Sequence, residues 1–168
     1  MAYKAWTHII IGAGAAGCVL AHRLAKNKEF NILLLEAGKN GSWDPTLKVP
    51  MMTAMLLRGE RHVWQYSTDE ETGLENRKIS LPRGKVLGGS TTINGMVYAR
   101  GLGSDYDNWA QTGLTDWSWA RVSPYFLRSE LYCGDNPGEL HSQRGLLTVS
   151  SRKKPLSPLV DAFVESGI

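Results

Sequence analysis

Three glycines near the N-terminus, Gly12, Gly14 and Gly17, have the spacing of a phosphate-binding turn. They follow a β-branched run at residues 7–11 and lead into an apolar pattern with helical spacing, which predicts a strand, a tight turn and a helix. Free backbone N–H groups and the positive end of the helix dipole attract a pyrophosphate, and Gly12 and Gly14 carry no side chain that would block it. These residues indicate a site for a dinucleotide, although glycines that serve packing alone are the alternative.

A second strand is predicted at residues 31–36, where a continuous apolar run ends on Glu36. Such a run is typical of a parallel strand that is buried on both faces. Glu36 follows Gly17 by about 20 residues, the distance at which a nucleotide-binding βαβ unit places an acid against the adenosine ribose hydroxyls. A carboxylate there disfavours a ribose phosphate and so argues against NADP, whereas NAD and FAD both remain open on this segment.

A second small-residue motif lies between Leu81 and Arg100. Gly88 and Gly89 permit a backbone path that larger residues would block, and the hydroxyl and amide side chains that follow, from Ser90 to Asn94, could bind phosphates, a ribityl chain or a flavin ring edge. An ordinary surface turn is the alternative for this composition. The two motifs together favour a flavin dinucleotide.

The segment 84–94 (GKVLGGSTTIN), with Tyr98, Gly101 and Asp107 after it, resembles the signature loop of the glucose-methanol-choline (GMC) oxidoreductases. The resemblance extends over nearly the whole chain. It implies that Ala15 and Ala16 border the pyrophosphate of FAD, that Glu36 binds the adenosine ribose, and that the second motif faces the flavin. The predicted cofactor-binding residues are Gly12, Gly14, Ala15, Ala16, Gly17, Glu36, Trp64, Arg83, Gly89, Ser90, Asn94, Gly95, Met96 and Val97.

The resemblance implies oxidation of an alcohol (CH–OH donor) to an aldehyde or ketone by hydride transfer to flavin N5. The histidine base of the family lies near its C-terminus, so no catalytic residue is assigned in this chain. Some members attach FAD through a histidine at the position of Ile93, so non-covalent FAD is predicted here. A flavin-holding lyase on the same scaffold and an NAD-dependent dehydrogenase are the alternatives.

The fold class predicted is α/β, a Rossmann-like FAD-binding βαβ sheet with part of an α+β substrate-binding domain, incomplete in this chain. Residues 1–150 are expected to form the N-terminal part of the FAD-binding domain, with the flavin loop at 81–101, and residues 151–168 to begin a truncated substrate-binding region. Residues 37–100 are predicted to be loop-rich, with one short helix near 51–57. A capped helix is predicted from Ser157, and a companion C-terminal polypeptide is expected as partner.

Composition narrows the remaining possibilities. The chain has 168 residues, 42% hydrophobic and 21% charged residues and a net charge of +3, which is ordinary for a globular domain and indicates no nucleic-acid partner. The basic run Arg152–Lys154 is interpreted as a solvated strand end. The longest apolar run is broken by glycines and the N-terminus leaves no room for a signal peptide, so no membrane association is expected and a cytoplasmic location is predicted from the two distant cysteines.

The other residues that could do chemistry have structural interpretations. The four histidines show no metal-ligand spacing, and no metal site is predicted. Asp105 and Asp107 are interpreted as helix-cap or loop residues. The cluster Trp109, Trp117 and Trp119 is expected to serve packing.

Overall fold

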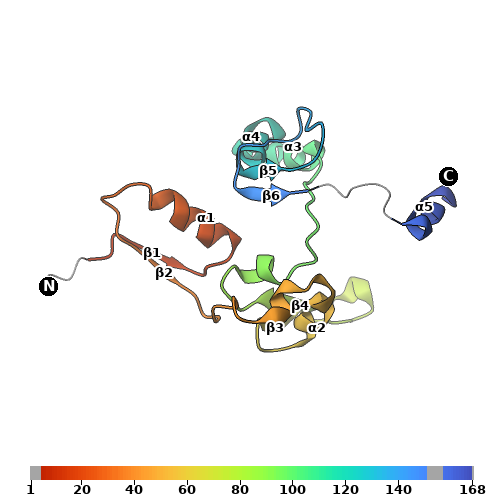
Figure 1. The fold of residues 1–168 in the computed structure, drawn as a ribbon, viewed down its shortest axis with the longest axis horizontal. Helices are drawn as coiled ribbons and strands as arrows, with labels where there is room; N and C mark the ends of the chain where they lie inside the picture. Colours follow the sequence, from red (N-terminus) through yellow and green to blue (C-terminus); the bar gives the residue numbers. More distant parts are fainter. Residues whose placement is uncertain (1–4, 151–156, 168) are drawn as a thin grey trace. The chain divides into compact units, whose positions relative to one another are not determined.

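The computed structural model describes residues 5–150 and 157–167, and Figure 1 follows the chain by colour from the N-terminus to the C-terminus. The chain divides into two compact units, Met1–Val97 and Tyr98–Ile168. The break after Val97 does not coincide with the domain boundary expected at residue 150, which stays a prediction. The basic run Arg152–Lys154 lies outside the described residues.

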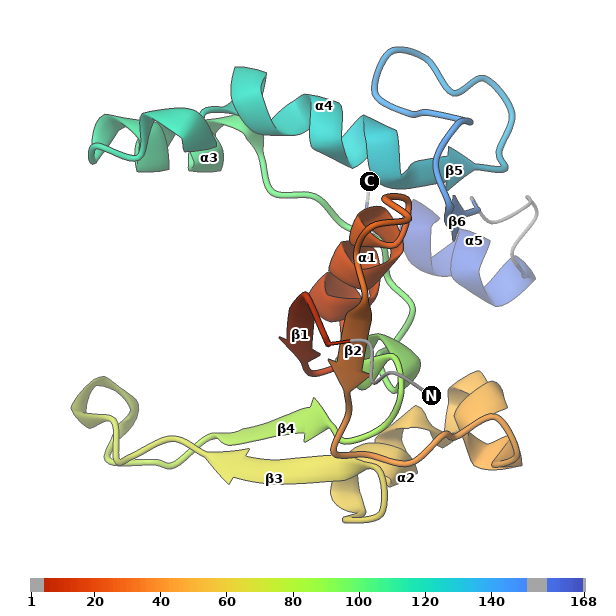
Figure 2. The same ribbon diagram turned by 90° about the vertical axis from the view of Figure 1, so that its left-hand side faces the viewer.

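The first unit begins with the predicted βαβ element: β1 (His8–Ile11), α1 (Ala15–Leu24) and β2 (Ile32–Leu35). β1 and β2 pair in parallel, with His8 opposite Ile32 and Ile11 opposite Leu35. α1 runs beside this pair and connects the two strands in the manner of a crossover helix (Figure 2). The α/β fold class and the order strand, glycine turn, helix, strand are therefore confirmed.

The burial expected for β2 on both faces is not found. Ile9 and Ile11 of β1 are 60% and 86% exposed, and Leu35 of β2 is 46% exposed. Among the described residues the sheet contains only these two strands, so neither strand has a second neighbour to cover its apolar side chains. The apolar run at residues 31–36 is therefore typical of a buried parallel strand, although the described residues supply only two strands of such a sheet.

The prediction of a loop-rich segment between residues 37 and 100 was wrong in one respect. β3 (Val63–Ser67) and β4 (Ser80–Gly84) form an antiparallel pair, visible as two adjacent arrows in Figure 2. Pro82 lies inside β4 and hides the strand from sequence rules, but an edge strand tolerates a missing N–H donor. The predicted short helix is confirmed as α2. The short helices of this segment are η1 (Pro45–Lys48), η2 (Pro50–Met52), α2 (Thr53–Arg58), η3 (Thr72–Leu74) and η4 (Gly89–Thr92).

A small apolar core joins β3 to the second motif. It consists of Val63, Val86 and Ile93, all at most 3% exposed, with Leu47 and Leu57 packed against them. Two of the three central residues, Val86 and Ile93, come from the motif itself. The loop is therefore anchored in the core by its apolar side chains.

The second unit contains helices and one small sheet. Asp105 accepts a hydrogen bond from the Leu102 N–H at 2.8 Å and Ser157 Oγ accepts one from the Val160 N–H, so both predicted caps are confirmed. Trp109 and Trp119 pack around Tyr106, as expected for a packing cluster. The elements of this unit are α3 (Gly103–Gln111), η5 (Thr115–Trp117), α4 (Trp119–Ser129), β5 (Glu130–Tyr132), β6 (Leu147–Val149), which pairs in parallel with β5, and α5 (Pro158–Glu165).

A fully buried carboxylate, that of Glu130, organises the second unit. Its Oε2 accepts hydrogen bonds from Arg100 Nη2 at 2.7 Å and from the Ser142 N–H at 3.0 Å. Its Oε1 lies 2.9 Å from His141 Nδ1. Burial alone raises the pKa of Glu130, but the hydrogen bonds from His141 and Ser142 and the Arg100 charge outweigh it and hold the pKa below its usual value of 4.5. The ionised carboxylate thus ties β5 to the chain around residue 141.

Across the described residues, none of the helices has the length and apolar character needed to cross a lipid bilayer.

Candidate functional site

The turn between β1 and α1 has the geometry that a phosphate site needs. Gly12 has φ +92°, a conformation that side chains rarely adopt. A Cβ on Gly17 would collide with the carbonyl oxygen of Gly12, so the helix can approach the turn only with glycine there. Gly14 caps α1 without any side-chain hydrogen bond, which leaves the first-turn N–H groups of the helix free for a ligand.

The second motif contacts this turn directly. The Gly88 N–H donates to the Ala13 carbonyl at 2.8 Å. Gly89 is buried with φ +59°, and a Cβ placed on it would lie 2.8 Å from the Cα of Gly14. Because backbone meets backbone here, the two glycine motifs form one continuous surface without side chains. Residues more than 70 positions apart therefore build a single cradle.

The cradle forms one wall of a groove of about 580 Å³. Six of the fourteen predicted cofactor residues come together there, and the volume falls within the range of small-molecule and cofactor sites. The lining residues are Ile11, Gly12, Gly14, Leu35, Glu36, Ala37, Trp64, Gly84, Gly89 and Ser90.

Glu36 lies at the carboxyl end of β2, where its carboxylate accepts two backbone hydrogen bonds. Oε2 accepts from the Ala13 N–H at 2.7 Å and Oε1 from the Gly38 N–H at 2.8 Å. A carboxylate can accept about four hydrogen bonds, so it retains capacity for two ribose hydroxyls. The side chain is thus held in place by backbone donors on the rim of the groove.

Trp64 on β3 is far from the glycine turn in sequence, but its side chain lines the same groove. Lys85 Nζ lies 3.9 Å from the centroid of its ring, a cation–π contact, and Tyr66 stacks at 6.3 Å. These contacts fix the orientation of the indole. Sequence reasoning missed Lys85, because no local pattern connects a lysine with a tryptophan on the facing strand.

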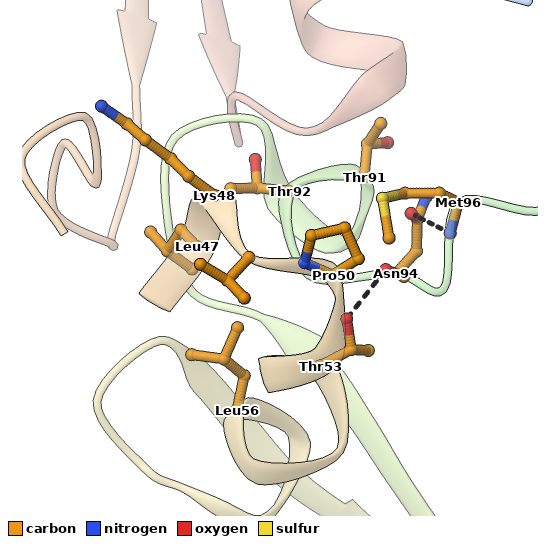
Figure 3. A pocket seen from close by; sticks show the side chains of 10 residues that line it. Leu47, Lys48, Pro50, Thr53, Leu56, Thr91, Thr92, Asn94 and Met96 are labelled. Carbon is orange, nitrogen blue, oxygen red and sulfur yellow. Dashed lines mark hydrogen bonds between the residues drawn. The ribbon is translucent and has the colours of Figure 1, made fainter. Parts of the chain in front are cut away.

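Two smaller cavities follow the groove, the first sharing a residue with the groove and the second sharing a residue with the first. Ser90 lines both the groove and a cavity of about 280 Å³ that also contains Arg83 and Asn94. Asn94 in turn lines a cavity of about 260 Å³ together with Met96 and Thr53 (Figure 3). Figure 3 shows the Thr53 hydroxyl directed at the Asn94 carbonyl, and the Met96 N–H donates to Asn94 Oδ1 at 2.9 Å. The part of the second motif from Gly89 to Asn94 therefore borders the groove or one of the two cavities at nearly every residue.

The remaining predicted residues lie near these cavities without lining them. Ala15, Ala16 and Gly17 form the first turn of α1, and Gly95 and Val97 are exposed at the end of the second motif. All five are described residues, and none of them lines the groove or the two cavities.

The groove fits the flavin dinucleotide that the sequence predicts. A cradle that a single Cβ would fill, a helix N-terminus without a side-chain cap and a carboxylate with free acceptor capacity on one rim are the elements that a dinucleotide diphosphate and its adenosine require. The described residues hold no group of three or more His, Cys, Asp or Glu side chains suited to a metal ion.

The sequence profile of the family described as GMC oxidoreductase matches residues 6–168. The chain belongs to the GMC oxidoreductase family. Oxygen-dependent choline dehydrogenase of Vibrio vulnificus is 44% identical over 165 residues, which cover 96% of this chain and 29% of that protein. The enzyme of the same name from Paraburkholderia phymatum is 43% identical over 171 residues, 100% of this chain and 30% of that protein.

Solved structures agree with the GMC fold. The crystal structure of pyridoxine 4-oxidase from Mesorbium loti superposes with a TM-score of 0.84 at 31% identity and covers 97% of this chain and 32% of that one. A formate oxidase from Aspergillus oryzae, studied for FAD modification, gives 0.80 at 27% identity, 99% of this chain and 30% of that one. This GMC chain thus spans less than a third of the length of each relative.

Proposed function

We propose that this chain is the FAD-binding N-terminal portion of an enzyme that oxidises the CH–OH group of a small alcohol to an aldehyde or ketone. The observation that carries the proposal is the groove in which Gly14, Glu36 and Gly89 meet, because its glycine cradle suits a dinucleotide diphosphate. The names of the choline dehydrogenases and of the pyridoxine 4-oxidase support an alcohol as the donor.

Bound FAD would supply the hydride acceptor, and the protein supplies its placement. The first turn of α1, with Ala15 and Ala16, borders the diphosphate, and Glu36 binds the adenosine ribose. The second motif, from Ser90 to Val97, borders the flavin side. The cavity that shares Ser90 with the groove supports this direction for the dinucleotide.

The catalytic base is proposed to lie outside the described residues. None of the histidines in the described residues lines the groove or the two adjoining cavities. His62 is buried against Asp44, and His141 contacts Glu130 in the other unit. We therefore assign the described residues to cofactor binding and positioning, and we expect a companion C-terminal polypeptide to supply the proton acceptor.

The test is anaerobic reduction of the flavin by alcohols. The chain purified together with its companion polypeptide is expected to show the oxidised flavin spectrum, and at least one of choline, pyridoxine or a series of primary alcohols is expected to bleach it. A flavin that no alcohol bleaches would favour the lyase alternative. Protein that carries a nicotinamide instead would favour the NAD-dependent dehydrogenase.

We also propose that the FAD is held without a covalent bond. Ile93 occupies the position at which some family members attach the cofactor, and its side chain is 2% exposed, packed with Val63 and Val86. An alkyl side chain cannot form such a bond. Acid precipitation is expected to release all of the yellow colour into the supernatant, and colour that stays with the washed pellet would contradict this.

We also propose that the protein is located in the cytoplasm. Cys18 and Cys133 are both free and exposed, which supports a reducing environment. A redox-sensitive reporter fused to the protein would test this location: a reduced reporter is expected, and an oxidised one would contradict it.

A further inference from the structure

A buried, hydrogen-bonded pair of polar side chains in the first unit has no part in the site described so far. Among the described residues of this unit, the buried polar or charged side chains are Asp44 and His62, 9% and 4% exposed. His62 Nε2 lies 2.8 Å from Asp44 Oδ2. Burying an ionised carboxylate with its partner costs solvation free energy, and well-packed apolar residues of similar volume are often at least as stabilising. Its presence in so small a core calls for a role other than stability.

The Asp44 carboxylate is fully engaged. Oδ1 accepts hydrogen bonds from the Thr46 hydroxyl at 2.6 Å and from the Thr46 N–H at 3.0 Å. Oδ2 contacts His62 and lies 3.1 Å from Arg61 Nη1. Hydrogen bonds from Thr46 and His62, with the Arg61 charge, hold the pKa of Asp44 well below its usual range. The carboxylate is thus a fixed, ionised anchor.

The His62 ring depends on this anchor alone. Its Nδ1 is buried and has no hydrogen-bond partner among the described residues. One nitrogen therefore sets the ring position, through Asp44. The backbone of the same residue reaches the second motif, since the His62 carbonyl accepts from the Lys85 N–H at 2.7 Å. Val63, the next residue, packs against Val86 and Ile93.

Asp44 is connected to the second motif through the helix η1 that follows it. It caps η1 (Pro45–Lys48), whose Leu47 packs against the core of Val63, Val86 and Ile93. The residues after Asp44, from Leu47 to Pro50, form one wall of the cavity in Figure 3, and the second motif supplies Thr91, Thr92, Asn94 and Met96 to the same cavity. The pair therefore links the two walls of this cavity. The side chains of Asp44 and His62 contact each other, and the His62 backbone carbonyl binds the second motif at Lys85.

We propose that His62 is a positioning residue for the cofactor. Through Asp44 it holds the segment 44–50 against the second motif, and so sets the path of residues 85–97 along the FAD. This inference rests on the proposed function. It adds a residue that touches neither the groove nor its two adjoining cavities, and that acts through the backbone of the loop.

The test compares two substitutions of His62 in the flavin-loaded protein. His62→Gln keeps an N–H donor near the place of Nε2, whereas His62→Leu keeps apolar volume and removes the donor. His62→Leu is expected to weaken FAD binding by about tenfold to 100-fold, because small displacements of a supporting shell have effects of that size on a site. It is also expected to shift the flavin absorbance bands, while His62→Gln restores both towards wild type. His22→Leu, on the exposed face of α1, is the matched control and is expected to change neither.

The outcomes separate this inference from the proposed function. Wild-type protein that carries no flavin would contradict the proposed function itself. Wild-type binding and spectrum in His62→Leu, or equal losses in His62→Leu and His62→Gln, would overturn the positioning role. If His62→Leu does not fold, Thr46→Val decides, because it removes one hydrogen bond to Asp44. Weaker FAD binding in that variant supports the role, and unchanged binding overturns it.

Discussion

Gly17→Ala is expected to abolish retention of FAD during purification. The new Cβ would collide with the backbone carbonyl of Gly12, an atom that cannot rotate away, so α1 must move off the turn. Overpacking of this kind costs about 1–3 kcal/mol, and a collision with backbone falls at the upper end of the range. If the whole of this cost is taken from the free energy of FAD binding, the dissociation constant of FAD rises about 100-fold. Flavin content per polypeptide, read from the visible spectrum, measures the effect.

The matched control is Gly73→Ala, where an added Cβ has no neighbour within 4 Å and φ is not positive. That variant is expected to keep its flavin. Circular dichroism of the apoprotein distinguishes a local displacement from unfolding. If Gly17→Ala retains full flavin content, the glycine turn is not the diphosphate site.

Arg100→Met is expected to destabilise the second unit by about 3–5 kcal/mol, because it leaves a buried carboxylate without its cationic partner. Glu130 is 0% exposed, and Arg100 Nη2 lies 2.7 Å from its Oε2. A second guanidinium nitrogen donates to the Leu140 carbonyl at 2.6 Å, so the substitution also removes an exposed hydrogen bond to the chain before His141. Thermal and urea unfolding of the flavin-loaded protein measure the change, and Arg121→Met, on the exposed face of α4, is the control.

The pH dependence of stability provides an independent readout of the same network. Folding lowers the pKa of Glu130, so its contribution to stability is complete above the usual value of 4.5 and is lost as the pH falls below it. Loss of Arg100 weakens that lowering. The difference in melting temperature between wild type and Arg100→Met is therefore expected to narrow from pH 7 to pH 4. A constant difference would show that Arg100 acts by packing on Tyr98 and Phe126 rather than by charge.

Local patterns predicted the elements whose residues contact one another along the chain. The glycine turn between β1 and α1, the short helix α2 and the caps at Asp105 and Ser157 depend on neighbours a few residues away, and sequence reasoning found them. β3 and β4 were missed because each has a weak local signal, and their strand character comes from pairing with each other across 12 intervening residues at the near end (Ser67 to Ser80).

The candidate site divides in the same way. Residue type and spacing alone pointed to a dinucleotide turn, a ribose carboxylate and a flavin loop, because each of these is a short segment with a distinctive composition. Which of them meet was decided by the tertiary structure: the contact of Gly89 with Gly14, the lysine on Trp64 and the pair of Asp44 with His62. Such contacts join residues 18 or more positions apart, or lie across paired strands, and depend on the path of the folded backbone. A linear pattern records which side chains are present, and only close packing in three dimensions determines which of them touch.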